Sequence, residues 1–207
     1  MLDQPIVMLD FETTGLSPAM GDRITEVAAL RIVDGVVVER FVSLINCGVR
    51  IPSFITGLTG ISQAMVDNAP PVAEVVPQLL DFIGSDPLSA HNASFDDKFL
   101  RAEAERLELT PRYPSLVCSL KLSRRVFPEL GSYKLGHLSG ALGIRFNSAA
   151  HRAEADAEVA AKLLVHIGGH LRSTYGIRHV DSELLVSVNK LAAAKVPQFL
   201  QKRGQPV

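Results

Sequence analysis

The first apolar segment of the chain runs Ile6-Val7-Met8-Leu9-Asp10-Phe11-Glu12-Thr13-Thr14-Gly15. A continuous apolar run that ends in acidic residues is typical of a buried strand that stops at a solvent-facing edge. Side chains two residues apart on a strand point to the same side, so Asp10 and Glu12 face together while Phe11 points into the opposite layer. Gly15 permits a turn with positive φ directly afterwards. The segment therefore predicts a buried strand that delivers two carboxylates to one face of a sheet.

Further strands and helices follow along the chain. Asp34-Gly35 is a two-residue hairpin signal between strand-like segments at 24–33 and 36–45, and short apolar runs at 87–90 and 116–118 predict two more strands. Caps and apolar periodicity predict a short helix after Ser62, helices at 70–83, 94–107 with Ser94 as N-cap, 120–126, 134–142, 153–173 and 181–195, and a loose end at 196–207. A hairpin followed by strand and helix alternation predicts an α/β fold with a mixed central sheet flanked by helices.

Length and composition indicate one globular core. The chain has 207 residues, of which 47% are hydrophobic and 21% charged, and no apolar run approaches the roughly 20 residues of a membrane span. The N-terminus enters a strand at once, without the basic region and cleavage site of a secretory signal, so we expect a cytoplasmic location. The clearest boundary falls near Gly176, which predicts a catalytic domain over 1–178 and a helical C-terminal tail over 179–207.

Charge and cysteine content exclude two classes of protein. The net charge of -1 lacks the basic excess of a protein that holds nucleic acid by electrostatics alone. Residues 181–207 carry +2 and the rest -3, so the tail could contact a substrate or partner, although a solvated tail explains its charge better. Cys47 and Cys118 lie in no CxxC or Cys/His cluster, which argues against a structural zinc site or a disulfide framework.

Two further patches carry groups that could join the first. Asp96 falls in the first turn of its predicted helix, where the helix dipole favours a carboxylate. His151 and Asp156 are about 140° apart around one helix and would diverge there. They can reach the same cleft if His151 precedes the helix and Asp156 lies on its second turn. Each patch alone has a purely structural explanation, and only the combination points to a shared site.

The combined set suits hydrolysis of a phosphodiester. Clustered carboxylates repel each other unless a cation neutralises them, and hard divalent ions such as Mg²⁺ or Mn²⁺ prefer oxygen ligands. Two such ions can stabilise the attacking and leaving oxygens of an in-line displacement. A histidine with a near-neutral pKa can take the proton from the attacking water. Four acids and one histidine supply every group that this two-metal reaction needs.

The same residues give the chain a family resemblance. It resembles the DEDDh (DnaQ-like) 3′-to-5′ exonucleases, which include the proofreading epsilon subunit of bacterial DNA polymerase III. The resemblance covers about residues 5–172 and rests on three ordered motifs: Val7-Met8-Leu9-Asp10-Phe11-Glu12-Thr13-Thr14-Gly15, His91-Asn92-Ala93-Ser94-Phe95-Asp96 with Phe99-Leu100, and His151-Arg152-Ala153 with Asp156-Ala157. It implies a ribonuclease H-like exonuclease fold.

The resemblance also implies roles for individual residues. Asp10, Glu12, Asp96 and Asp156 would ligate two divalent ions, Mg²⁺ or Mn²⁺, and His151 would act as general base. Thr13 and Thr14 become candidates for contact with the terminal 3′ nucleotide. The expected activity is release of nucleoside 5′-monophosphates from single-stranded or frayed 3′ ends, with DNA as the expected substrate and a role in proofreading or repair.

Two alternatives stay open from the sequence. An RNA-directed exoribonuclease would share every catalytic residue and differ in contacts to the 2′-hydroxyl. A non-catalytic module that docks on a DNA polymerase would keep the fold without the chemistry, although such a module has no use for clustered carboxylates. A polymerase partner is compatible with either reading, and no membrane partner is expected. His91 is expected to orient the loop before Asp96 rather than to bind metal.

Overall fold

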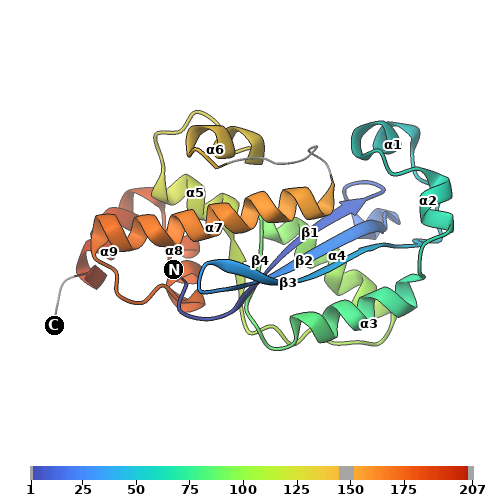
Figure 1. Cartoon of the computed structure of the whole chain (residues 1–207), viewed down its shortest axis with the longest axis horizontal. Coiled ribbons are helices and arrows are strands. Elements are labelled where there is room, and N and C mark those ends of the chain that lie inside the picture. Colours follow the sequence, from blue (N-terminus) through green and yellow to red (C-terminus); the bar gives the residue numbers. More distant parts are fainter. Residues whose placement is uncertain (1, 145–151, 205–207) are drawn as a thin grey trace.

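A mixed five-stranded sheet forms the centre of the structure, a computed structural model that describes residues 2–144 and 152–204. The strand order is β3-β2-β1-β4-β5 (Figure 1). The strands are β1 (Ile6–Thr13), β2 (Ile24–Val33), β3 (Val36–Leu44), β4 (Leu88–Ala90) and β5 (Leu116–Cys118). β1 pairs antiparallel with β2 and parallel with β4, so it is the strand at which the two halves of the sheet meet. The predicted α/β class and mixed sheet are confirmed.

The hairpin and the parallel half arise from different connections. β2 and β3 are joined through Asp34 and Gly35, both of which have positive φ, as a tight two-residue hairpin requires. β4 and β5 are reached through long helical connections, which parallel strands need. Both strands are short; β4 lies beside β1, and β5 lies beside β4 at the edge of the sheet. The predicted ranges 24–33 and 116–118 match β2 and β5, those for β3 and β4 differ from the structure by one residue, and β1 extends beyond the apolar run through Thr13.

Alternation along β1 separates the core into two layers. Ile6 and Met8 pack with α7 (Ala153–Tyr175) and the helices around it. Val7, Leu9 and Phe11 pack on the opposite face with α3 (Val72–Ile83) and α4 (Ala93–Arg106). Figure 1 shows α7 running along one side of the sheet and α3 on the other. Buried apolar surface on both faces is the main source of stability for such a three-layer arrangement.

The remaining helices complete the layers. They are η1 (Pro18–Met20), α1 (Ser53–Thr59), α2 (Gln63–Asp67), α5 (Ser119–Val126), α6 (Leu135–Ala141), α8 (Ser182–Lys190), η2 (Ala193–Lys195) and α9 (Val196–Gly204). The predicted cap of α2 is confirmed, because the Ser62 hydroxyl accepts a hydrogen bond of 3.3 Å from the Met65 amide. Helix α1 was not predicted: it begins after Pro52 and contains Gly57, so its own sequence favours helix weakly.

Two local predictions are wrong. Helix α4 starts at Ala93 with Asn92 as its N-cap, not at Ser94, because Asn92 adopts a left-handed φ of 79° that turns the chain sharply after β4. Asparagine tolerates this conformation better than most residues. The predicted loose end from 196 is helix α9 as far as Gly204, because Val196 and Leu200 are fully buried and hold it against the rest of the molecule.

The C-terminal helices pack against the same core as the sheet. Val180, Leu185 and Val188 join the cluster that contains Ile6 and Met8. The predicted helix at 181–195 ends at Lys190, where Leu191 turns into extended backbone. The division of the chain at residue 178 remains a prediction; after it the structure has α8, η2 and α9 as far as residue 204.

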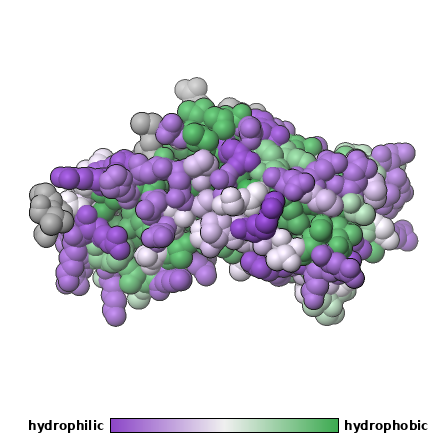
Figure 2. All heavy atoms as spheres, turned by 90° about the horizontal axis from the view of Figure 1, so that it is seen from below, coloured by the Kyte–Doolittle hydropathy of each residue, from purple (hydrophilic) through white to green (hydrophobic). Residues whose placement is uncertain are grey.

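The surface mixes polar and apolar residues. Figure 2 shows hydrophilic residues over most of one face, interrupted by hydrophobic patches. Large apolar side chains are exposed on three segments, namely the loop after β1, helix α1 and edge strand β3: Leu16, Met20, Phe54, Leu58, Val36, Val38 and Val42. Among the helices that the structure describes, none combines the length and apolar character that crossing a membrane requires. Cys47 and Cys118 are free buried thiols.

Candidate active site

Strand β1 brings the first two acids to the face of the sheet that α7 covers. Asp10 and Glu12 continue the alternation of Ile6 and Met8, while Phe11 is buried in the opposite layer. Both carboxylates are half-buried at the carboxyl end of the strand. The register with β2 shifts between Glu12 and Thr13, and such a bulge re-aims side chains at a strand end. The predicted pair of carboxylates on one face is therefore confirmed.

Helix α7 supplies the third acid. Asp156 lies in its first turn, on the face toward β1. Asp10, Glu12 and Asp156 each offer a carboxylate oxygen, and these oxygens all lie within 4.8 Å of one another. This acidic cluster, formed by Asp10, Glu12 and Asp156, joins residues that are far apart in the sequence. Oxygen ligands at this spacing can converge on one hard divalent cation.

Asp96 reaches the same strand end from the other layer. Strand β4 stops at Ala90, so the next part of β1 has no parallel partner on that side. The chain turns through Asn92 into α4, and Oδ1 of Asp96 accepts a hydrogen bond of 3.2 Å from the backbone N–H of Phe11. Asp96 is only 3% exposed. Asp96 does not belong to the cluster of Asp10, Glu12 and Asp156 whose carboxylate oxygens lie within 4.8 Å of one another. It is instead hydrogen-bonded to the backbone of Phe11, the residue between Asp10 and Glu12.

The electrostatics of the site disfavour charge on these acids. Burial raises the pKa of Asp10 well above its ordinary value, and the neighbouring carboxylates, Asp96 first, raise it further. Burial and the Asp156 carboxylate raise the pKa of Glu12 to about 7. Burial raises the pKa of Asp96 to about 8 although the Phe11 amide opposes the shift. Carboxylates whose charged forms are disfavoured by burial and by one another are a donor set that a divalent cation would stabilise.

The predicted general base lies outside the described residues. His151 belongs to the segment 145–151, and nothing in the structure tests its role. Arg152, the next residue, is described and is the N-cap of α7. Asp156 lies in the first turn of the helix and not in the second, where it was expected, while the expected place of His151 before the helix stays a prediction.

The loop after β1 holds the two threonines by internal bonds. The Thr13 hydroxyl donates to the Gly15 carbonyl at 2.6 Å, and the Thr14 hydroxyl accepts from the Arg23 amide at 3.0 Å. The expected positive φ at Gly15 is wrong. A Cβ atom at this position would lie 2.4 Å from Oδ1 of Asp22, so a larger residue would displace the carboxylate that accepts a hydrogen bond from the Ser17 amide. Both threonine side chains are buried, so their hydroxyls serve the loop.

Two further residues near the site make contacts with distant partners. His91 binds the Ser119 hydroxyl with Nδ1 at 3.0 Å and the Tyr133 carbonyl with Nε2 at 3.1 Å, which agrees with a role in orienting the loop before α4. Glu26 of β2 is 2% exposed and binds Arg152 at the start of α7. Neither contact follows from local spacing, because the partners are 28 or more residues away.

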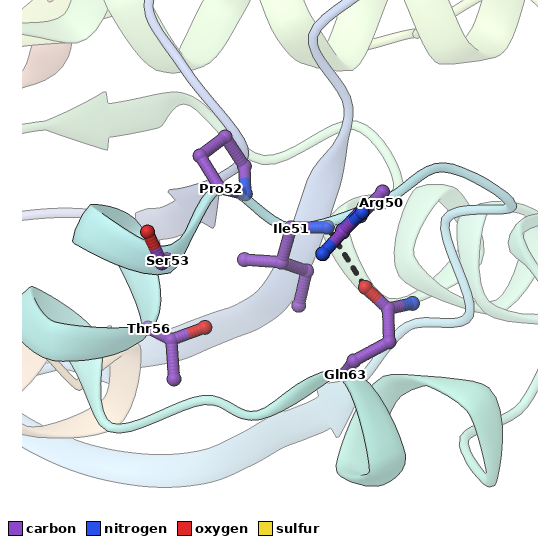
Figure 3. Close-up of a pocket in the computed structure, with 6 residues that line it drawn as sticks. All are labelled: Arg50, Ile51, Pro52, Ser53, Thr56 and Gln63. Carbon is purple, nitrogen blue, oxygen red and sulfur yellow. Dashed lines mark hydrogen bonds between the residues drawn. The ribbon is translucent and has the colours of Figure 1, made fainter.

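A cavity of about 600 Å³ lies elsewhere, between α1 and α2 (Figure 3). It is lined by Arg50, Ile51, Pro52, Ser53, Thr56 and Gln63. The Gln63 side chain accepts a hydrogen bond of 2.8 Å from the Ile51 amide, which ties α2 to the segment before α1. None of the predicted site residues lines this cavity, so it is separate from the acidic cluster.

Comparison with known proteins identifies relatives over most of the chain. Residues 7–164 match a family described as Exonuclease. The DNA polymerase III subunit epsilon of Aquifex aeolicus is 35% identical over 178 residues, which are 86% of this chain and 87% of that protein. The PolC-type DNA polymerase III of Caldanaerobacter subterraneus is 37% identical over 92% of this chain. The 3′-5′ exonuclease DinG of Bacillus subtilis is 38% identical over 83% of it. The chain spans only 14% and 18% of the lengths of these last two proteins.

Solved structures share the fold. Exonuclease X in complex with 5′ overhanging duplex DNA superimposes with a TM-score of 0.68 and 26% identity, over 89% of this chain and 99% of that one. Exonuclease I of E. coli has a TM-score of 0.72 at 21% identity, over 84% of this chain and 43% of its own, which supports the fold alone. The nuclease domain of a DEDDh family member bound to rAMP matches with a TM-score of 0.70 at 21% identity, over 81% of this chain and 92% of that one. With this ribonuclease H-like fold, its ordered acidic motifs and its relatives, the chain belongs to the DEDDh exonuclease family.

Proposed function

We propose that the chain is a metal-dependent 3′-to-5′ exonuclease that releases nucleoside 5′-monophosphates from the 3′ ends of DNA. The observation that carries the proposal is the cluster of Asp10, Glu12 and Asp156, whose carboxylate oxygens lie within 4.8 Å of one another. Asp96 completes the set from the opposite layer. A cluster that is electrostatically unfavourable without a cation suits catalysis better than docking.

The proposal assigns a role to each group. Asp10, Glu12, Asp96 and Asp156 hold two divalent ions, Mg²⁺ by preference, since proteins of this family typically use divalent metals. When bound, such ions would supply charge stabilisation for the attacking and leaving oxygens of the phosphodiester. His151 takes the proton from the attacking water. Thr13 and Thr14 shape the loop against which the terminal nucleotide binds, with contacts from the backbone rather than from their hydroxyls.

DNA is the proposed substrate because the relative with the same overall length is a DNA polymerase subunit and Exonuclease X was solved with DNA. Association with a polymerase is a proposal of the same kind, since relatives carry this segment as a small part of a polymerase III chain. Removal of 3′ nucleotides from DNA, with or without an associated polymerase, would serve repair or proofreading.

The deciding experiment is digestion of matched DNA and RNA oligonucleotides labelled at the 3′ or the 5′ end, in Mg²⁺, Mn²⁺ or EDTA. We expect stepwise shortening from the 3′ end of DNA that requires the metal. Asp10→Ala should be inactive with an unchanged circular dichroism spectrum. Full activity in EDTA would overturn the two-metal mechanism. Preferential digestion of RNA would show that RNA, not DNA, is the substrate. Absence of activity in both metals would favour a docking module.

A further inference from the structure

Glu26 is a buried acid that is not among the proposed metal ligands. It lies on β2 directly opposite Glu12 of β1, and residues that pair across antiparallel strands project to the same face. The Glu26 carboxylate therefore faces α7 beside the acidic cluster, with an exposure of 2%. Like charges at opposed positions of a sheet destabilise it. A fifth carboxylate beside such a cluster needs a specific reason.

The contacts of Glu26 lie at the start of α7. Its two oxygens accept hydrogen bonds of 2.6 to 3.2 Å from Nε and Nη2 of Arg152, a bidentate ion pair. Its Oε2 also accepts a hydrogen bond of 2.9 Å from the Ala153 amide. Arg152 is the N-cap residue and makes no capping bond with its own side chain. Glu26 therefore supplies the cap from a neighbouring strand and places negative charge at the positive end of the helix dipole.

This cap fixes the position of Asp156. The Asp156 amide donates a hydrogen bond of 3.0 Å to the Arg152 carbonyl, so one helical turn connects the capped end to the proposed ligand. Glu12 and Glu26 keep a fixed separation because their strands are paired in register. The distance from Glu12 to Asp156 is thus set through Glu26, Arg152 and a single turn of helix. Arg152 also faces Glu12 and lowers its pKa, which offsets part of the repulsion from the Glu26 carboxylate.

We propose that Glu26 and Arg152 form a positioning pair that sets where Asp156 lies relative to Glu12 and thereby determines the affinity of the site for divalent metal. The proposal rests on the metal-binding role proposed above for the acidic cluster. Residues that orient metal ligands typically change metal affinity by about 10- to 100-fold when they are replaced. The proposal places neither residue in contact with the substrate or the metal, so their replacement should leave the KM for DNA near its original value.

A second ion pair between the sheet and α7 supplies a matched control. Arg40 of β3 binds Glu158 at 2.7 Å and Glu154 at 3.1 Å, within the first two turns of the same helix. This pair holds the helix without capping it. If any loosening of α7 weakened metal binding, Arg40→Gln would behave like the Glu26 variants.

The test measures Mn²⁺ binding directly by calorimetry, together with exonuclease rate as a function of Mg²⁺ concentration. Glu26→Ala and Glu26→Gln should each weaken Mn²⁺ binding by about 10- to 100-fold. They should raise the half-saturating Mg²⁺ concentration by a similar factor, with kcat largely recovered at high metal. Glu26→Gln is decisive, because its amide oxygen can still cap Ala153 while its charge and its bidentate pairing are lost. Arg40→Gln should bind Mn²⁺ like the unsubstituted chain.

Three results would overturn the proposed positioning role of Glu26 and Arg152. These are unchanged Mn²⁺ affinity in Glu26→Gln, an equal loss in Arg40→Gln, and a change confined to the KM for DNA. If Glu26→Ala does not fold, Glu26→Gln and Arg152→Lys decide by the same measurements. Because Mn²⁺ binding is measured without substrate, a chain with no nuclease activity would contradict the proposed function and still test this inference.

Discussion

Asp96 of α4 and Phe11 of β1 are joined by a hydrogen bond of 3.2 Å between a buried carboxylate oxygen and a backbone amide, at the point where strand β4 ends. The bond satisfies a backbone amide that has no strand partner on that side, and it holds the Asp96 carboxylate at the backbone of the residue between Asp10 and Glu12. It gives Asp96 a structural role in addition to its proposed role as a ligand. The two roles can be separated by substitution.

Asp96→Asn should abolish exonuclease activity while the fold survives. The amide oxygen can still accept the Phe11 hydrogen bond, so we expect a free energy of unfolding within about 1 kcal/mol of the original in EDTA. Asp96→Ala loses the acceptor as well and should be less stable by about 1–3 kcal/mol, because the buried Phe11 amide loses its partner. Urea denaturation and oligonucleotide digestion provide the two readouts. Residual activity in Asp96→Asn would show that the carboxylate is not needed as a ligand.

The metal-free protein should lose stability as the pH rises. Burial raises the pKa of Glu12 from 4.5 to about 7 and that of Asp96 from 3.8 to about 8 in the folded state. The unfolded chain therefore binds fewer protons than the folded chain between about pH 4 and pH 8, and the contribution of these groups to the free energy of unfolding falls across that window. Saturating Mg²⁺ should remove most of the fall. Denaturation curves at several pH values, with Mg²⁺ and with EDTA, would test this, and identical curves would contradict it.

Asp10→Asn should stabilise the metal-free protein. Burial and neighbouring carboxylates raise the pKa of Asp10, so its charge destabilises the folded state at neutral pH. A neutral amide of the same size should raise the free energy of unfolding by about 1–3 kcal/mol in EDTA. The same variant should lose stabilisation by Mg²⁺ and lose activity. Thermal unfolding with and without Mg²⁺ measures both effects, and a less stable variant in EDTA would contradict the electrostatic account.

His151→Ala should lower the single-turnover rate by about 10²–10⁴ at saturating metal, the usual contribution of a general base. Mn²⁺ binding should be unchanged, since the histidine is not among the proposed ligands. Calorimetry measures the effect on metal binding, and rapid-quench digestion measures the effect on the rate. An unchanged rate would remove His151 from the mechanism.

Leu200→Ala should destabilise the whole chain by about 2–5 kcal/mol, as for other fully buried leucines. Leu200 lies in α9, and the apolar cluster that it joins also contains Ile6 and Met8 of β1. Gln201→Ala, at an exposed position of the same helix, is the control and should change stability little. A variant that unfolds α9 alone, with an unchanged main transition, would show that the tail is a separate unit.

Sequence patterns predicted the features that depend on local periodicity. The apolar run before Asp10 predicted β1, Asp34-Gly35 predicted the hairpin, and the long apolar period after Ala153 predicted α7. Because β1 alternates between two layers, the common facing of Asp10 and Glu12 also followed. The relative position of Asp96 did not follow, since it depends on where β4 stops and on the left-handed backbone at Asn92.

Other features depend on partners that are distant in the chain. Helix α9 forms because Val196 and Leu200 find a buried surface, and its own residues do not require a helix. Glu26 looked like an ordinary strand residue, and its function as a cap depends on an arginine 126 residues away. Such pairings become visible only when the tertiary structure brings the partners together.

The order of the acidic residues along the chain has a consequence for its synthesis. Asp10, Glu12 and Asp96 leave the ribosome first, and Asp156 follows later on α7. A nascent chain that has been synthesised only as far as the start of α7 lacks Asp156, the third member of the cluster. Under the proposed assignment, such a chain cannot degrade nucleic acid before its core is assembled, and the nuclease becomes active only as a finished fold.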